Sequence, residues 1–213
     1  MCWRILMTGL LCSCLVYPVI IDRIAVRVGN SIIKDSDIDR NLRVTNFLND
    51  KPLNMNSEAR REASKRLIDQ VFIRREVQLG DYPQATWEEA DQQLGRLTKE
   101  RYKNQAVWQQ AVHRYGLVEP DLRFEFRWQL TVLRFIDLRF KPAVLVTDEE
   151  IQKYYREHQT ALRRANPGKN SLDDLQDQIR DTLAGEKVNE QFFAWLDDQR
   201  KSSKVEFYEE SLR

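Results

Sequence analysis

The residues best suited to metal binding or proton transfer are two histidines, His113 and His158. They fall on different predicted helices, and no cysteine lies at metal-ligand spacing from either of them. Metal sites in proteins need three or four ligands held together, so this pair favours an exposed or half-buried structural role. The sequence therefore predicts no metal site and no cofactor.

Other signatures of catalysis are missing from the sequence, which contains no glycine-rich phosphate loop, nucleophile elbow or zinc-protease motif. Acidic pairs such as Glu88-Glu89, Glu149-Glu150 and Asp173-Asp174 follow a threonine or serine at predicted helix starts. Carboxylates there favour the positive end of the helix dipole, so capping explains the pairs without catalysis. We assign no catalytic residue and favour a protein that is not an enzyme.

Aromatic side chains are more numerous than one face of a small helical core requires. They are concentrated in residues 122–140, where apolar side chains point nearly all round a helix. Such a helix is either central to the fold or partly exposed for a binding partner, and the sequence leaves both readings open. The candidate binding residues are Trp108, Phe124, Phe126, Trp128, Phe135 and Phe140.

Four arginines alternate with these aromatics, namely Arg123, Arg127, Arg134 and Arg139. Aromatic and arginine side chains together can stack single-stranded nucleic acid. The chain, however, has 34 Lys and Arg against 33 Asp and Glu, which gives a formal net charge of +1. A dedicated polyanion binder carries a clear basic excess, so we expect no nucleic-acid partner.

Residues 1–21 differ from the rest of the chain, because Arg4 is the only charged residue before Asp22. A minimal positive start followed by a short apolar core is typical of an export signal, and the alternative is an uncleaved N-terminal anchor. All 3 cysteines lie in this segment, so the mature domain has no internal disulfide. We expect a location in the periplasm or cell envelope.

The segment Leu11-Cys12-Ser13-Cys14 also matches, loosely, the processing box of bacterial lipoproteins. In this reading Cys14 is the lipidated residue, and the protein is attached to a membrane through its N-terminal segment. Ordinary cleavage of the signal is the alternative.

The elements that position these residues are mostly helices. A chain of 213 residues can bury a core, and glycine and proline are scarce, with 7 and 6 copies. Capping signals predict helices that start at Ser36, Ser57, Thr86, Thr147 and Ser171. A further segment, about 121–141, is ambiguous, because residues 122–130 alternate with the period of a strand. Flanking helices and the lack of a turn residue favour a helix there.

The two ends of the mature chain carry strand patterns. Residues 24–28, a Gly29-Asn30 turn and residues 31–34 predict a hairpin, and residues 204–209 alternate like a strand. An isolated hairpin is marginal in water, so we expect the late strand to pair beside it. The predicted fold is mainly α, a helical bundle with a small antiparallel sheet formed by an N-terminal hairpin and a C-terminal strand.

Three segments, taken in order, resemble the SurA-type periplasmic chaperones. Residues 24–38 are similar to the hairpin and helix start that open that family, and residues 146–155 to the phrase that leads into its parvulin-type prolyl isomerase domain. Residues 172–206 resemble the helix and strand that follow the isomerase and return to the hairpin. Only about a dozen residues separate His158 from Ser171, so the isomerase domain is missing from this pattern.

The resemblance implies a chaperone domain over residues 22–213, with a helical core at about 36–163 and a C-terminal helix and strand at about 171–209. It implies an exported, ATP-independent chaperone that holds unfolded or partly folded envelope or outer-membrane polypeptides in an apolar cleft. The six aromatic residues given above are its candidate client contacts. Two alternatives stay open, a divergent peptidyl-prolyl cis-trans isomerase and a structural envelope lipoprotein or assembly subunit that docks one fixed partner.

Overall fold

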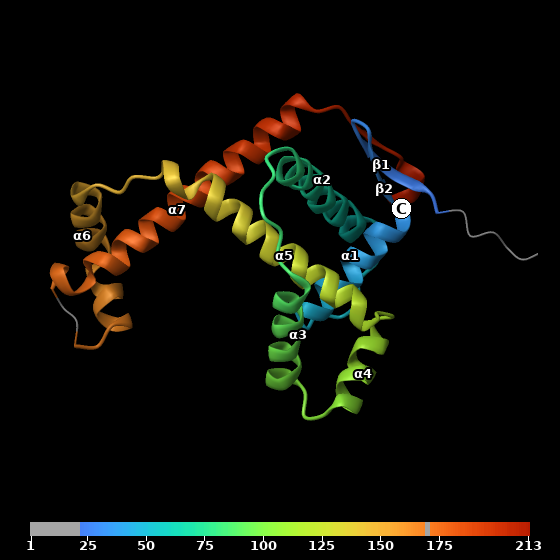
Figure 1. Cartoon of the computed structure of the whole chain (residues 1–213), viewed down its shortest axis with the longest axis horizontal. Coiled ribbons are helices and arrows are strands. Elements are labelled where there is room, and N and C mark those ends of the chain that lie inside the picture. The colour runs from blue at the N-terminus through green and yellow to red at the C-terminus, as the bar shows by residue number, and fades with distance from the viewer. Residues whose placement is uncertain (1–21, 169–170) are drawn as a thin grey trace, which may run out of the picture.

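The computed structural model describes residues 22–168 and 171–213, and helices make up most of it (Figure 1). The predicted export signal or anchor and the predicted lipidation site Cys14 lie outside the described residues. The strands are β1 (Ile24–Val28), β2 (Ser31–Lys34) and β3 (Val205–Phe207). The α-helices are α1 (Asp35–Leu48), α2 (Ser57–Leu79), α3 (Trp87–Arg101), α4 (Gln105–Arg114), α5 (Glu119–Arg139), α6 (Asp148–Ala165) and α7 (Leu172–Ser202). Short 3-10 helices are η1 (Lys141–Ala143) and η2 (Glu209–Ser211).

The three strands form one antiparallel sheet in the order β2-β1-β3. This confirms the prediction that the late strand pairs beside the N-terminal hairpin. Val26 of β1 pairs with Ile33 of β2 on one side and with Phe207 of β3 on the other. Gly29 has a φ of 56° in the hairpin turn, a left-handed conformation that glycine adopts without steric cost. The mainly α fold with a small terminal sheet is therefore as predicted.

The C-terminal end is fastened to the start of the helical body. Leu212 is completely buried in the main core, and Arg60 Nε of α2 donates to the Ser211 carbonyl oxygen at 3.0 Å. The same guanidinium pairs with Asp35 and Asp39 of α1. One arginine thus ties α1, α2 and the end of the chain together.

Three predicted helix starts are confirmed. The hydroxyl oxygens of Thr86, Thr147 and Ser171 accept hydrogen bonds from the backbone N–H groups three residues later, at 3.2 to 3.3 Å. In each case the third residue is an acid whose side chain bonds back to the cap. This reciprocal pattern is the capping box that the sequence indicated.

The other two predicted caps were wrong. Helix α1 begins at Asp35 directly after β2, and Ser36 lies in its first turn, where its hydroxyl donates to Asp22 at 2.6 Å. Asp22 also accepts from the Ser36 backbone N–H, and these bonds lower the pKa of the Asp22 carboxyl. Helix α2 is capped by Asn56, whose side-chain oxygen accepts from the Ala59 N–H at 2.8 Å, so Ser57 is already helical.

The ambiguous segment is helical throughout α5. Its first half packs Leu122 and Phe126 into one hydrophobic cluster, whereas Trp128 and Phe135 pack into another. Because one helix serves two clusters on different faces, apolar residues surround it and mimic a strand pattern locally. The helical prediction is confirmed.

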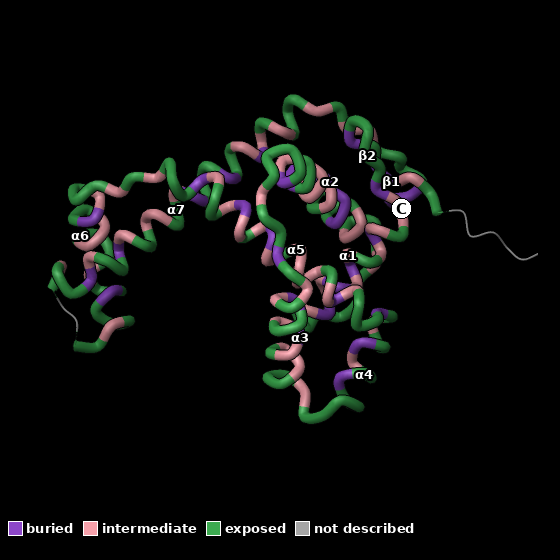
Figure 2. The backbone as a smooth tube through the Cα atoms, viewed as in Figure 1, coloured by how far each residue is buried: buried purple, intermediate pink, exposed green. Residues whose placement is uncertain are grey.

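In the described part of the chain, the buried residues coloured purple in Figure 2 form three clusters. The main core joins the sheet to α1, α2, α5 and α7. A second cluster joins the end of α1 to α3, α4 and the start of α5. A third, between α6 and the start of α7, lies in the helical hairpin that projects from the body in Figure 1. No helix of the described residues is both long and apolar enough to cross a membrane.

Candidate functional site

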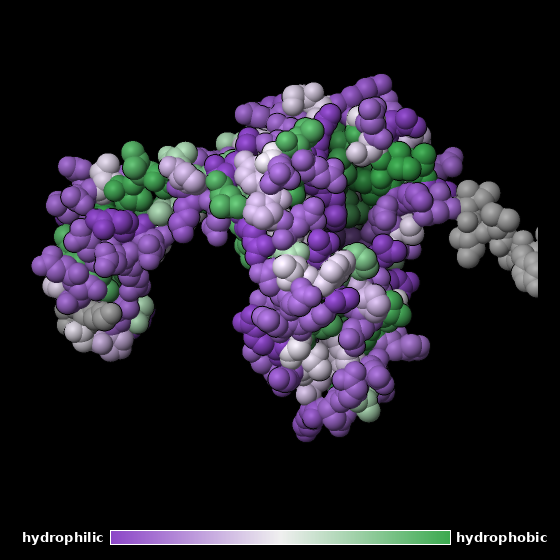
Figure 3. All heavy atoms as spheres, in the orientation of Figure 1, coloured by the Kyte–Doolittle hydropathy of each residue, from purple (hydrophilic) through white to green (hydrophobic). Residues whose placement is uncertain are grey.

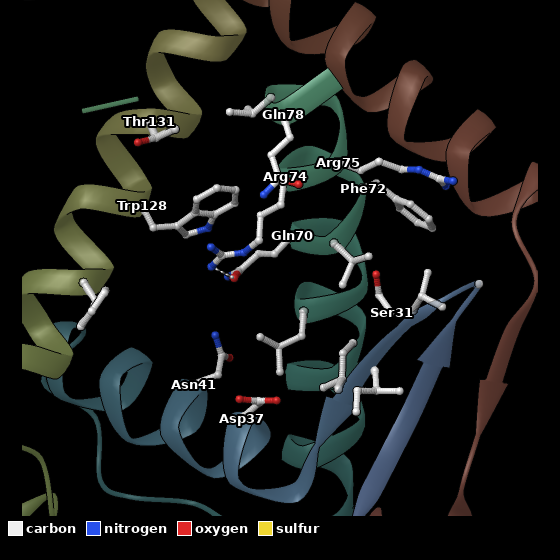
Figure 4. Close-up of a pocket in the computed structure, with 18 of the residues that line it drawn as sticks. Ser31, Asp37, Asn41, Gln70, Phe72, Arg74, Arg75, Gln78, Trp128 and Thr131 are labelled. Atoms are coloured by element: carbon white, nitrogen blue, oxygen red, sulfur yellow. Dashed lines mark hydrogen bonds between the residues drawn. The ribbon is translucent and has the colours of Figure 1, made fainter. Parts of the chain in front are cut away.

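A groove of about 1000 Å³ runs over α2, between α5 and the β-hairpin (Figure 4). Its walls also include residues of α1 and the turn from α7 into β3. Figure 3 shows hydrophobic side chains gathered beside α2 and the hairpin on the face in view. The groove therefore lies where elements from both ends of the chain meet.

Helix α2 supplies the apolar floor of the groove. Ile68 and Phe72, one helical turn apart, are buried in the main core. Leu67 and Val71 form a neighbouring row that is only half-buried and lines the groove. The apolar face of α2 is therefore wider than the core that covers it, and the excess is accessible.

Helix α5 and strand β2 add further apolar surface. Phe124 has 62% of its surface exposed, Trp128 is half-buried, and both line the groove. Ile32 of the edge strand β2 is 46% exposed and lines the groove from the other side. Three elements thus present large apolar side chains to one solvent-accessible space.

A cation–π contact joins the two long walls. The Arg74 guanidinium carbon lies 3.9 Å from the centre of the Trp128 ring, and Arg74 points from α2 towards α5 (Figure 4). Its nearest hydrogen-bond acceptor is the Gln70 side chain at 3.5 Å, a long and weak bond. Partial desolvation by the groove walls lowers the pKa of Arg74, whose side chain stays exposed, and the carboxylates of Glu125 and Asp37 act in the opposite direction.

Charged and polar side chains surround this apolar floor. The basic residues are Arg40, Arg74, Arg75, Arg127 and Lys204, and the acidic residues are Asp37, Asp121 and Glu125. An apolar centre with a mixed, charged rim is the anatomy of a surface that binds polypeptides.

Two of the six predicted aromatic residues, Phe124 and Trp128, line the groove. Phe126 is half-buried, packs against the second cluster and lines a separate hollow of about 310 Å³ with Leu48 and Leu97. The remaining three, Trp108, Phe135 and Phe140, are buried and do not line the groove.

The three buried aromatics hold the helices together. Trp108 packs edge-on against Phe47 in the second cluster, and its indole N–H donates to Glu119 at 3.3 Å. Phe135 and Phe140 contact each other in the main core with ring centres 5.8 Å apart.

Sequence reasoning missed the residues that α2 and β2 contribute, chiefly Ile32, Leu67, Val71 and Arg74. The signal that could have found Leu67 and Val71 is the second apolar row of α2, which runs beside the row that fills the core. A helix with two such rows has more apolar surface than one packed face needs.

Neither histidine lines the groove. His158 stacks on Tyr154 with ring centres 4.1 Å apart, and His113 is exposed on α4. Across the ranges 22–168 and 171–213, no group of three or more His, Cys, Asp or Glu residues could hold a metal ion.

The chain matches no protein-family model, and a search of the curated proteins finds no match.

Proposed function

We propose that this protein is an ATP-independent chaperone of the cell envelope, without isomerase activity, that holds unfolded or partly folded exported polypeptides in the groove. The observation that carries the proposal is the accessible apolar floor, to which α2, α5 and β2 each contribute large side chains. Unfolded chains expose apolar and aromatic groups, and such a floor binds them without a fixed sequence. Outer-membrane polypeptides are the proposed client class.

The charged rim supports a reversible mode of binding. Apolar burial yields about 25 cal/mol per Å², so a partly open groove binds an extended segment weakly. Mixed charges around the floor keep the unladen protein soluble. Weak and broad binding suits a compartment in which no ATP is available to release the client.

The order of elements supports a relation to SurA-type chaperones. The hairpin leads into α1, and β3 returns beside β1 after the longest helix. At the position where that family carries its isomerase, α6 is followed by the start of α7, and the two pack together around Ile151 and Ile179. A helical hairpin therefore occupies this position.

Two assays on the purified protein test the proposal. The first follows light scattering as two unrelated, chemically unfolded proteins are diluted with and without the protein, in the absence of ATP. We expect aggregation of both to be suppressed at stoichiometric amounts. The second follows cis-trans isomerisation of a short proline peptide, whose rate we expect to be unchanged.

Other outcomes identify the rival functions. Faster isomerisation of the peptide means that the protein is a divergent prolyl isomerase. Failure to suppress either aggregation, together with capture of one stoichiometric partner from the envelope, means that it is an assembly subunit.

A further inference from the structure

The basic residues of the groove differ in how far their charges are already paired. Arg40 Nε lies 3.5 Å from Asp121 Oδ1, and Lys204 Nζ lies 2.6 Å from Glu206 Oε1. Arg127 donates to the Ala85 carbonyl oxygen at 2.8 Å and lies over the Trp87 ring. These three side chains are occupied by partners within the protein.

Arg74 and Arg75 form no ion pair with any carboxylate of the described residues. In Figure 4 they extend to opposite sides of α2, so only Arg74 lies beside Trp128. The Arg74 side chain is exposed in the groove, where it contacts the Trp128 ring and makes the long bond to Gln70, while the carboxylates of Glu125 and Asp37 act on it only beyond ion-pair distance. A guanidinium without a hydrogen-bonded carboxylate gains from an anionic ligand that can accept its N–H groups.

The arrangement also places an aromatic surface next to that charge. With the guanidinium carbon 3.9 Å from the Trp128 ring centre, a carboxylate on Arg74 and a ring packed on the Trp128–Phe124 side lie side by side. In an extended polypeptide, side chains two positions apart point the same way and lie roughly 7 Å apart. One extended segment can therefore reach both groups.

We propose that the groove selects extended segments in which an acidic residue stands two positions from an aromatic one, with the carboxylate bound by Arg74 and the aromatic ring packed beside Trp128. The inference rests on the proposed function and names the client class that the groove prefers. The lining contains five basic and three acidic residues. Its excess of positive charge also attracts acidic segments over a longer distance.

Three fluorescent peptides of equal length test the inference. Each repeats the four-residue pattern phenylalanine, serine, test residue, serine, and the test residue is aspartate, asparagine or lysine. Fluorescence anisotropy with the purified protein measures their dissociation constants at low and high salt. We expect the aspartate peptide to bind about tenfold more tightly than the asparagine peptide, which corresponds to about 1.4 kcal/mol, and the lysine peptide to bind most weakly. High salt reduces these differences.

Two variants locate the effect. Arg74→Gln removes the proposed carboxylate contact and should abolish the difference between the aspartate and asparagine peptides. Arg156→Gln removes the same charge from an exposed position on α6, outside the groove lining, and should leave the difference intact. Should Arg74→Gln fold poorly, the peptide series on the unaltered protein still decides, because equal affinities contradict the inference.

The peptide and aggregation assays together distinguish failure of the acidic preference from failure of the chaperone proposal. If all three peptides bind equally and unfolded proteins are still held, the acidic preference is wrong and the chaperone proposal stands. If no peptide binds and no aggregation is suppressed, both are wrong.

Discussion

The Arg74 guanidinium of α2 lies over the Trp128 ring of α5, with 3.9 Å between the guanidinium carbon and the ring centre. Such a contact contributes about 0.5 to 2 kcal/mol, depending on how far it is removed from water. It spans the groove between two helices that are also packed on the main core. The contact holds the indole of Trp128 at the groove wall, available to a ligand.

Phe124 and Phe193 offer a matched test of the groove, because they are 62% and 60% exposed on different helices and only Phe124 lines it. Phe124→Ala should weaken the binding of an unfolded client about five- to tenfold, or about 1 to 1.4 kcal/mol, because apolar contact area is lost. Phe193→Ala should leave binding unchanged. Titration of each variant with a labelled unfolded protein measures this, and equal losses would place client binding elsewhere.

Substitutions of Gly185 and Gly29 test the backbone conformation of α7 and of the hairpin turn. A Cβ added at either position meets no atom within 4 Å, but Gly29 has a φ of 56° and Gly185 lies inside α7. Gly185→Ala should therefore raise the free energy of unfolding by about 0.5 to 1 kcal/mol, because alanine favours the helix. Gly29→Ala should lower it by about 1 kcal/mol through backbone strain. Urea unfolding measures both, and stabilisation by Gly29→Ala would contradict the turn geometry.

The end of the chain is a structural part of the main core. Leu212 is 0% exposed, so Leu212→Ala should lower the free energy of unfolding by about 2 to 5 kcal/mol. Leu145, which is 81% exposed, gives the matched control. Leu145→Ala should change the free energy of unfolding by less than about 0.5 kcal/mol. Both values come from denaturant unfolding followed by tryptophan fluorescence. A cost below 1 kcal/mol at Leu212 would show that the terminus is loosely held.

Glu89 should make stability depend on pH. Its carboxylate accepts from the Thr86 backbone N–H and from Arg134, both at 2.7 Å, and these bonds, the backbone bond first, lower the pKa of Glu89. Because the folded-state pKa is lowered, the stabilisation is complete above the ordinary glutamate pKa of about 4.3 and is lost as the pH falls through the folded value. Glu89→Gln should therefore lower the Tm at neutral pH, by an amount that shrinks below about pH 4.

Thermal unfolding over a series of pH values checks this behaviour. Glu186 of α7 is the control, since it is exposed and has no ion pair among the described residues. Glu186→Gln should change the Tm little at any pH. A Glu89→Gln effect that is constant with pH would mean that the ionised carboxylate is not what stabilises the contact.

Local signals were sufficient for most of the secondary structure. The turn at Gly29 and the caps at Thr86, Thr147 and Ser171 depend on residues within a few positions, and all were predicted correctly. The start of α1 was predicted wrongly, since Ser36 lies in the first turn and bonds Asp22, 14 positions before it. A local capping rule contains no information about such a partner.

The candidate site was predicted only in part, for a similar reason. Phe124, Trp128 and Phe135 share one helix and look alike in sequence, yet the first is exposed, the second half-buried and the third buried. How far each of these side chains is buried depends on how α5 packs against the two hydrophobic clusters.

The sequence by itself determined the helices, the hairpin and the return of the last strand to the first, because turn chemistry, capping and periodicity act over short distances and two short strand segments need a common sheet. Only the tertiary structure decided that α2 keeps Leu67 and Val71 accessible and that Arg74 meets Trp128. Those contacts join elements far apart in the chain, and their geometry follows from how the helices pack.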